Sequence, residues 1–181
     1  MRKEDDGELR IRCPLAGEHQ VENAVTAAVA LRRLGIADLA ITQGIAAASW
    51  PGRLERVSSR PDIVLDGAHN PSGARALASY MKRFYPGRDI TLIYGAMRDK
   101  AVAEIAGILF PAVRTVIATA PAQERATRPE TIRELSGQDT LISHSVAEAL
   151  QMVAGAGPDE AVFVTGSLFV VGEARRLLRP A

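Results

Sequence analysis

Five short apolar runs alternate with amphipathic segments through most of the chain, and this alternation constrains the fold more than any other feature. The runs are rich in β-branched residues and read DIVLDGA, ITLIYGA, TVIATA, TLIS and AVFVTGS. Continuous apolar strands separated by helices are typical of a parallel sheet that is covered on both faces. Residues 51–181 are therefore predicted to form an α/β domain with a mostly parallel sheet and helices on both faces.

The segment before Pro51 shows a different pattern. In HQVENAVTAAVALRRLG, apolar residues recur at helical spacing, and Gly35 follows as a stop signal, which predicts a helix over 20–34. A second helix is predicted through LAITQGIAAAS, with Asp38 as its cap. The two helices form a hairpin that is too small to be a domain. If they are the end of an incomplete domain, the apolar stripe of the first helix lacks partners.

The composition excludes several classes of protein. The chain has 181 residues, of which 47% are hydrophobic, so it can bury a full core. A formal net charge of +1 lacks the excess of basic residues that is typical of proteins that bind nucleic acid. The single cysteine, Cys13, cannot form an internal disulfide, and the N-terminus lacks the apolar region of a signal peptide. No apolar stretch approaches the roughly 20 residues needed to span a bilayer. We expect a cytoplasmic protein without nucleic-acid or membrane partners.

The stretch DGAHNP lies where an apolar strand ends and a helical pattern begins at Pro71, with Asn70 as the expected cap. In open, Rossmann-like sheets ligands bind at this edge, where free N–H groups attract anions. Asp66 could accept hydrogen bonds from a ribose diol, and His69 could donate to a phosphoryl or carboxylate oxygen. The alternative is that Asp66 and Asn70 only shape the turn and that His69 is a surface imidazole.

Two further turns carry candidate ligand groups. In WPGRLERV a turn presents Arg53 before a short strand, and an arginine placed in this way can pair bidentately with a phosphate. Otherwise Arg53 is a solvated residue on an edge strand. At the end of VFVTGS, Gly166, Ser167 and nearby amides repeat the strand, glycine and helix order and could hold a carboxylate. The alternative for Ser167 is a helix cap.

Five motifs in order carry a family resemblance: GEHQVENA, WPGRLE, DGAHNP, GAMRDK and TGSLFVVGEAR. Together they resemble the folylpolyglutamate synthase/dihydrofolate synthase branch of the Mur ligase superfamily. Members of that branch join a carboxylate to glutamate, using ATP and magnesium to form an acyl phosphate. The resemblance implies that residues 1–50 are the end of the central ATPase domain. It also implies that residues 51–181 are the C-terminal glutamate ligase domain, and that the ATPase domain is its partner in cis.

The same resemblance implies roles for individual residues. Asn23 matches the asparagine that contacts the adenine of ATP, Arg53 matches the arginine on its phosphates, and Asp66 matches the acid on its ribose. His69 matches a histidine near the acyl phosphate or the incoming glutamate. Ser167, with Gly166 and nearby amides, could then hold the α-carboxylate of glutamate. Arg53 and His69 are therefore the candidate catalytic residues, and no metal ligand is carried over.

The sequence also departs from a complete family member. A P-loop requires a glycine followed by lysine, and none of Lys3, Lys82 and Lys100 follows a glycine. The magnesium ligands of the family also lie upstream of the helical hairpin, so we expect the chain alone to be inactive. In GAMRDK the family's second acid is replaced by Ala101, so Asp99 and Lys100 are interpreted as surface charges at a helix start.

Three classes of function stay open. The favoured one is an ATP-dependent amide ligase that adds glutamate to a folate or dihydropteroate carboxylate. The second is another ligase of the superfamily, acting on muropeptide or cyanophycin, although the glutamine in EHQVENA favours the folate branch. The third is a non-catalytic module that binds a nucleotide or glutamate, because a fold alone does not choose among functions. Whether the product is dihydrofolate, a polyglutamate or both stays open.

Overall fold

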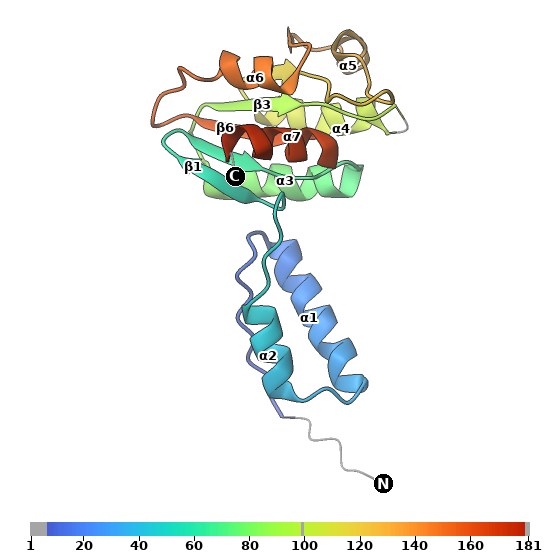
Figure 1. The fold of residues 1–181 in the computed structure, drawn as a ribbon, viewed down its shortest axis with the longest axis vertical. Coiled ribbons are helices and arrows are strands. Elements are labelled where there is room, and N and C mark those ends of the chain that lie inside the picture. The colour runs from blue at the N-terminus through green and yellow to red at the C-terminus, as the bar shows by residue number, and fades with distance from the viewer. Residues whose placement is uncertain (1–6, 99, 180–181) are drawn as a thin grey trace. The chain divides into compact units, whose positions relative to one another are not determined.

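The chain divides into two compact units between Trp50 and Pro51. The structure, a computed structural model, describes residues 7–98 and 100–179. The first unit contains two helices, and the second contains the sheet with the remaining helices (Figure 1). Each unit is described by itself below.

The first unit is a helical hairpin of α1 (Glu18–Arg33) and α2 (Asp38–Ala46), so the two predicted helices are confirmed. The predicted cap of the second helix is wrong, because the N-cap is Ala37 and no side chain caps the helix. Asp38 lies in the first turn instead, where its two oxygens accept hydrogen bonds from Nε and Nη2 of Arg32 at 2.7 and 2.6 Å. The bonds from Arg32 hold the pKa of Asp38 below its usual value.

The apolar stripe of α1 is only partly covered. Ala28 is 5% exposed, whereas Val21, Val25 and Val29 are 47%, 48% and 51% exposed. Leu39 of α2 is 68% exposed. Large aliphatic side chains at this exposure form an apolar face that the described residues leave open to solvent. Such a face is expected if residues 1–50 are the end of an incomplete domain, and that division stays a prediction.

The second unit is built on a six-stranded sheet in the order β1-β2-β6-β3-β4-β5. Strand β1 is antiparallel to β2, and every other neighbouring pair is parallel, so the predicted fold class is confirmed. All five apolar runs form strands. The strands are β1 (Glu55–Ser59), β2 (Asp62–Leu65), β3 (Ile90–Tyr94), β4 (Thr115–Ala118), β5 (Leu141–Ile142) and β6 (Ala161–Thr165).

Helices connect the parallel strands and cover the sheet. They are α3 (Pro71–Phe84), α4 (Val102–Leu109) with the short η1 (Phe110–Ala112), α5 (Pro129–Ser136), α6 (Val146–Met152) and α7 (Leu168–Leu178). In α3 Leu77 and Met81 are buried, whereas Phe84, which continues their helical spacing, is 53% exposed. The helix ends at Phe84, and the next residue, Tyr85, is buried instead. No helix in the described ranges is long and apolar enough to cross a membrane.

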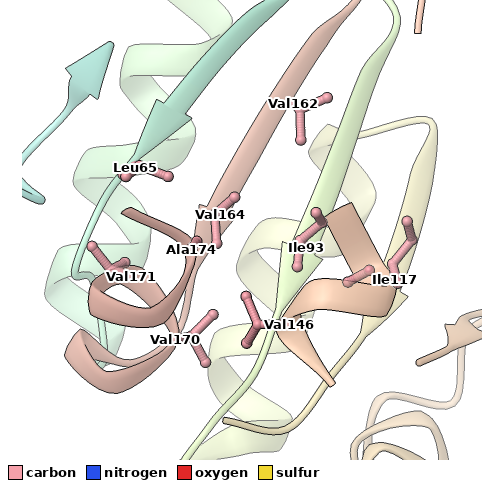
Figure 2. Packing of buried hydrophobic residues seen from close by; sticks show 10 residues of the cluster. Leu65, Ile93, Ile117, Val146, Val162, Val164, Val170, Val171 and Ala174 are labelled. Atoms are coloured by element: carbon pink, nitrogen blue, oxygen red, sulfur yellow. The ribbon is translucent and has the colours of Figure 1, made fainter. Parts of the chain in front are cut away.

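The core lies on both faces of the sheet. One row of neighbouring strand residues packs beneath α6 and α7 (Figure 2): Leu65, Val164, Ile93 and Ile117. Because side chains alternate along a strand, the next row, which includes Phe163, faces the other side. There the ring of Phe163 meets Tyr85, after α3, at 5.0 Å, and Tyr94 meets Phe110, after α4, at 5.4 Å. Helices therefore cover both faces, as predicted.

The carboxyl ends of the central strands meet at one edge of the sheet, where backbone hydrogen bonds hold the loops together. The N–H of Asp66 donates to Val164, that of Gly95 to Thr165, and that of Gly166 to Ala68. Three loops that are far apart in the sequence are thereby fixed side by side. This is the edge at which ligands bind in sheets of this type.

Candidate functional site

The turn DGAHNP joins β2 to α3 as the sequence predicts. The side chain of Asn70 accepts a hydrogen bond from the N–H of Gly73 at 2.8 Å, and Pro71 occupies the first helical position. An asparagine cap followed by proline is a favourable way to begin a helix. The predicted cap is therefore confirmed, and residues 66–69 are left between the strand end and the helix.

Asp66 is buried, with 6% of its surface exposed. Its Oδ1 accepts from the N–H of Ala68 and its Oδ2 from the N–H of Leu54, each at 3.0 Å. The carboxylate thus ties its own turn to the turn that precedes β1. These contacts support the alternative weighed above, in which Asp66 shapes the turn, and a ribose contact stays a prediction.

Replacing Asp66 with asparagine is expected to destabilise the 181-residue chain by roughly 2 kcal/mol. An amide accepts through only one of its two terminal atoms, so one buried backbone N–H loses its partner. Urea unfolding of the isolated chain measures the effect, with the exposed Asp139→Asn as the matched control. An Asp66→Asn chain with the stability of the control would contradict the structural role.

The turn before β1 is held against DGAHNP by its backbone. The N–H of Gly67 donates to the carbonyl of Gly52 at 2.8 Å, in addition to the bond between Leu54 and Asp66. Leu54 is buried and has a φ of 47°, a left-handed conformation that is rare for a bulky side chain. Such strain persists only where the surroundings enforce it, and it clusters at functional sites.

Arg53 is presented by this strained turn. A Cβ on Gly67 would lie 3.4 Å from Nη1 of Arg53 and 2.4 Å from Cδ2 of Leu168. The guanidinium therefore lies beside the backbone of Gly67, near the start of α7, and only glycine fits between them. The structure confirms that a turn sets Arg53 ahead of a short strand, and its contact with phosphates stays a prediction.

Glu55 braces the same turn, a role that the sequence analysis missed. Its Oε2 accepts from the N–H of Gly52 at 2.8 Å, and Nε of Arg175 in α7 donates to both carboxylate oxygens at 3.1 and 3.0 Å. Both charged residues stand in quoted motifs, WPGRLE and TGSLFVVGEAR. Their opposite charges were the available signal, but a separation of 120 residues gives no local indication of pairing.

A cavity of about 190 Å³ opens at this edge of the sheet. It brings together two predicted site residues, His69 and Ser167, although neither Arg53 nor Asp66 lines it. Its lining consists of His69, Met97, Lys100, Arg125, Gly166, Ser167, Leu168 and Phe169.

Two cations of the cavity were not predicted as site residues. Lys100, interpreted above as a surface charge, lines the cavity, while Asp99 of the same motif lies outside the described residues. Arg125 comes from the loop after β4, and its only sequence signal was a position beyond the carboxyl end of a strand. Together the two side chains place positive charge in the cavity.

His69 is partly buried, and its ring orientation is set by its own turn. Nδ1 lies 2.8 Å from the carbonyl oxygen of Gly67. A carbonyl oxygen only accepts, so Nδ1 carries the hydrogen, and in the neutral ring Nε2 is the nitrogen with a lone pair. His69 can therefore offer an acceptor to a ligand in the cavity.

Ser167 caps α7, which is the alternative weighed above. It is 3% exposed, and its Oγ accepts from the N–H of Phe169 at 3.1 Å. Gly166 precedes it with a φ of 98°, and a Cβ there would lie 2.6 Å from the carbonyl oxygen of Gly95. The tight turn directs the beginning of α7 to the cavity, where helix N–H groups favour an anion. Contact of Ser167 with glutamate stays a prediction.

Asn23 belongs to the first unit, on the exposed surface of α1. Its Nδ2 donates to Oε1 of Gln20, one turn earlier, at 3.4 Å. The amide is thus oriented by a neighbour on the same helix. Its contact with adenine stays a prediction.

The chain is similar to known proteins over most of its length. Residues 52–168 match the family described as Mur ligase, glutamate ligase domain. A probable bifunctional folylpolyglutamate synthase/dihydropteroate synthase of Halobacterium salinarum is 40% identical over 177 residues, covering 94% of this chain and 22% of the relative. The folylpolyglutamate synthase of Lacticaseibacillus casei is 35% identical over 184 residues, covering 97% of this chain and 42% of the relative.

Solved structures agree with these matches. The folylpolyglutamate synthase of Mycobacterium tuberculosis, complexed with ADP and AMPPCP, superimposes with a TM-score of 0.84 at 32% identity, covering 94% of this chain and 42% of that one. A Yersinia pestis folylpolyglutamate synthase/dihydrofolate synthase, complexed with AMPPNP and a manganese ion, gives 0.82 at 25% identity, covering 96% and 42%. The chain spans less than half the length of these relatives.

Proposed function

Because the chain belongs to the Mur ligase family through its glutamate ligase domain, we propose that it is the glutamate-binding part of an ATP-dependent amide ligase. Residues 51–181 are the C-terminal domain of that ligase, and residues 1–50 are the end of its central ATPase domain. The open apolar face of α1 supports this division, because a missing remainder of the central domain explains it. The acceptor is a folate or dihydropteroate carboxylate, and the names of the relatives support this branch of the family.

The observation that carries the proposal is the cavity at the carboxyl edge of the sheet. L-glutamate has two carboxylates, and the cavity offers Lys100, Arg125 and the amino end of α7 as groups that bind anions. We place the α-carboxylate at Gly166 and Ser167 and the side-chain carboxylate at the two cations. Met97 and Phe169 contact the aliphatic stem between them.

His69 is the residue of this cavity that handles the glutamate amine. With Nδ1 donating to Gly67, the lone pair on Nε2 can accept a hydrogen from the amine as it attacks the activated acceptor. The amine must be neutral to act as a nucleophile, and transfer of its proton to Nε2 leaves the amine nitrogen with a lone pair for the attack. His69 therefore orients the amine and accepts its proton.

ATP supplies the phosphoryl group that converts the acceptor carboxylate into an acyl phosphate. Gly67 and Arg53 fit one wall of a nucleotide site. Because Gly67 has no Cβ, it leaves space beside the guanidinium of Arg53. Arg53 offsets charge on the phosphates, and Asn23 and Asp66 are assigned to the adenine and the ribose. Magnesium is assigned to the rest of the ligase, because the family resemblance carries no metal ligand over to this chain.

Two alternatives make different predictions for the full-length protein. A muropeptide or cyanophycin ligase would release phosphate in the presence of those acceptors and not with a folate, whereas a binding module would release none. We propose the folate acceptor, with the reaction taking place in the cytoplasm. Phosphate release that depends on glutamate and a folate acceptor separates the three.

The 181-residue chain is expected to bind L-glutamate weakly by itself, because the cavity lies within its second unit. Lys100→Met and Arg125→Met should each raise the Kd about tenfold, since each removes a charged partner of a carboxylate. Isothermal titration calorimetry measures the binding, and Arg133→Met, an exposed arginine of α5 outside the cavity, is the matched control. Equal affinity in all four chains would rule out the cavity as the glutamate site.

A further inference from the structure

A second cavity of about 430 Å³ lies at the amino end of α5. Its lining consists of Arg98, Thr127, Arg128 and Thr131. The two arginines are exposed, whereas Thr127 is 5% exposed and forms the buried part of the lining. Two cations around a buried hydroxyl indicate an anion as the occupant.

The hydroxyl of Thr127 is the feature that requires an explanation. Its Oγ1 is buried and has no hydrogen-bond partner among residues 7–98 and 100–179. The residue is held in place by its backbone N–H, which donates to the carbonyl of Ala96 at 2.8 Å. Burial of an unpaired hydroxyl costs free energy, and such a group in a native structure points to a missing partner. Thr127 also lines the cavity, which is therefore where we look for that partner.

The beginning of α5 adds donors at the same place. Its N-cap is Arg128, and no side chain caps the helix. The first intrahelical bond is donated by Ile132, so the N–H groups of Glu130 and Thr131 precede the helical ladder. The carboxylate of Glu130 lies 3.7 Å from Nδ1 of His144, and neither of these two residues lines the cavity.

The second cavity is separate from the glutamate cavity. A β-bridge pairs Met97 with Ala126, and the N–H of Arg98 donates to the carbonyl of Arg125 at 3.0 Å. Met97 and Arg125 line the first cavity, whereas Arg98 and Thr127 line the second. The two linings share no residue.

We propose that this cavity is an oxyanion-binding site that takes a carboxylate or a phosphate group. The hydroxyl of Thr127 donates to one oxygen of the anion, and the guanidinium groups of Arg98 and Arg128 neutralise its charge. The N–H groups at the beginning of α5 contribute further donors. The proposal does not depend on the ligase assignment, because no residue of the glutamate cavity takes part.

Titration of the ¹⁵N-labelled 181-residue chain with inorganic phosphate, and separately with glutarate, tests the proposal by NMR. Either anion should shift the amide signals of Thr127 and Thr131 along a saturating curve. Thr127→Val and Arg128→Gln should each raise the Kd about tenfold. Saturation by phosphate alone assigns a phosphate group, saturation by glutarate alone assigns a carboxylate, and saturation by both supports the shared chemistry.

Two controls keep the result from being confused with a folding defect or with the glutamate cavity. Thr127→Val should leave thermal stability equal or higher, because it replaces an unpaired buried hydroxyl by a methyl group of similar size. Arg133→Gln, on an exposed position of the same helix, and Arg125→Met, in the other cavity, should leave the Kd unchanged. The proposal is overturned if neither anion saturates these signals, or if Thr127→Val and Arg128→Gln bind as the controls do.

Discussion

Replacing Gly166 with alanine is expected to destabilise the 181-residue chain by roughly 3 kcal/mol and to lower its melting temperature by about 10 °C. Gly166 has a φ of 98°, which strains any residue with a Cβ. The added Cβ would also lie 2.6 Å from the carbonyl oxygen of Gly95 and 2.6 Å from a ring carbon of Tyr94. Neither group yields easily, since one is backbone and the other is a ring buried in the core.

Gly172→Ala is the matched control for this loss. Gly172 lies within α7, and a Cβ there would meet no heavy atom within 4 Å. Because alanine favours a helix more than glycine does, this variant should be as stable as the wild type or more so. Calorimetry on both chains measures the difference, and equal melting temperatures would show that the turn at Gly166 is not constrained as described.

The second large effect is expected for Arg53→Ala in the full-length ligase, where turnover should fall by a factor on the order of 10² to 10³. The variant removes a positive charge that we assign to the phosphates of ATP. Its effect should therefore be on kcat more than on KM, since charge develops during phosphoryl transfer. Steady-state measurement of phosphate release with varied ATP gives both constants.

The control for Arg53→Ala is Arg60→Ala, an exposed arginine between β1 and β2. Both variants should unfold at the wild-type temperature, because neither removes a buried side chain from the core. Unchanged kcat in Arg53→Ala would leave the residue as a solvated arginine next to an edge strand. That outcome would remove the phosphate contact while leaving the glutamate cavity untouched.

Strands β2, β3, β4 and β6 were predictable because they are largely buried on both faces and therefore read as continuous apolar runs. Val64, Leu92 and Val164 are 1%, 0% and 0% exposed, which is the burial that such runs indicate. Helix ends were less predictable. The periodicity of α3 includes Phe84, but the chain leaves the helix there, and Tyr85 fills the core position instead.

The candidate site was predictable only where its residues belong to turns with a local signature. His69 and Ser167 lie four and two residues after the ends of β2 and β6, so the sequence locates them at the carboxyl edge of the sheet. Arg125 and Thr127 lie in a loop without periodicity, and they reach the edge through the pairing of Met97 with Ala126. That pairing is a long-range contact, which a local pattern does not report.

The order of the strands has a consequence for synthesis and folding. Strand β6 is the last strand along the chain, yet it lies between β2 and β3 at the centre of the sheet. Pairing of β2 with β6 joins residues about a hundred positions apart, and such non-local contacts form slowly. Until β6 leaves the ribosome, β2 and β3 each have an unpaired apolar edge that is prone to aggregation. Protection by chaperones is therefore most needed just before the strand that precedes Gly166 becomes available.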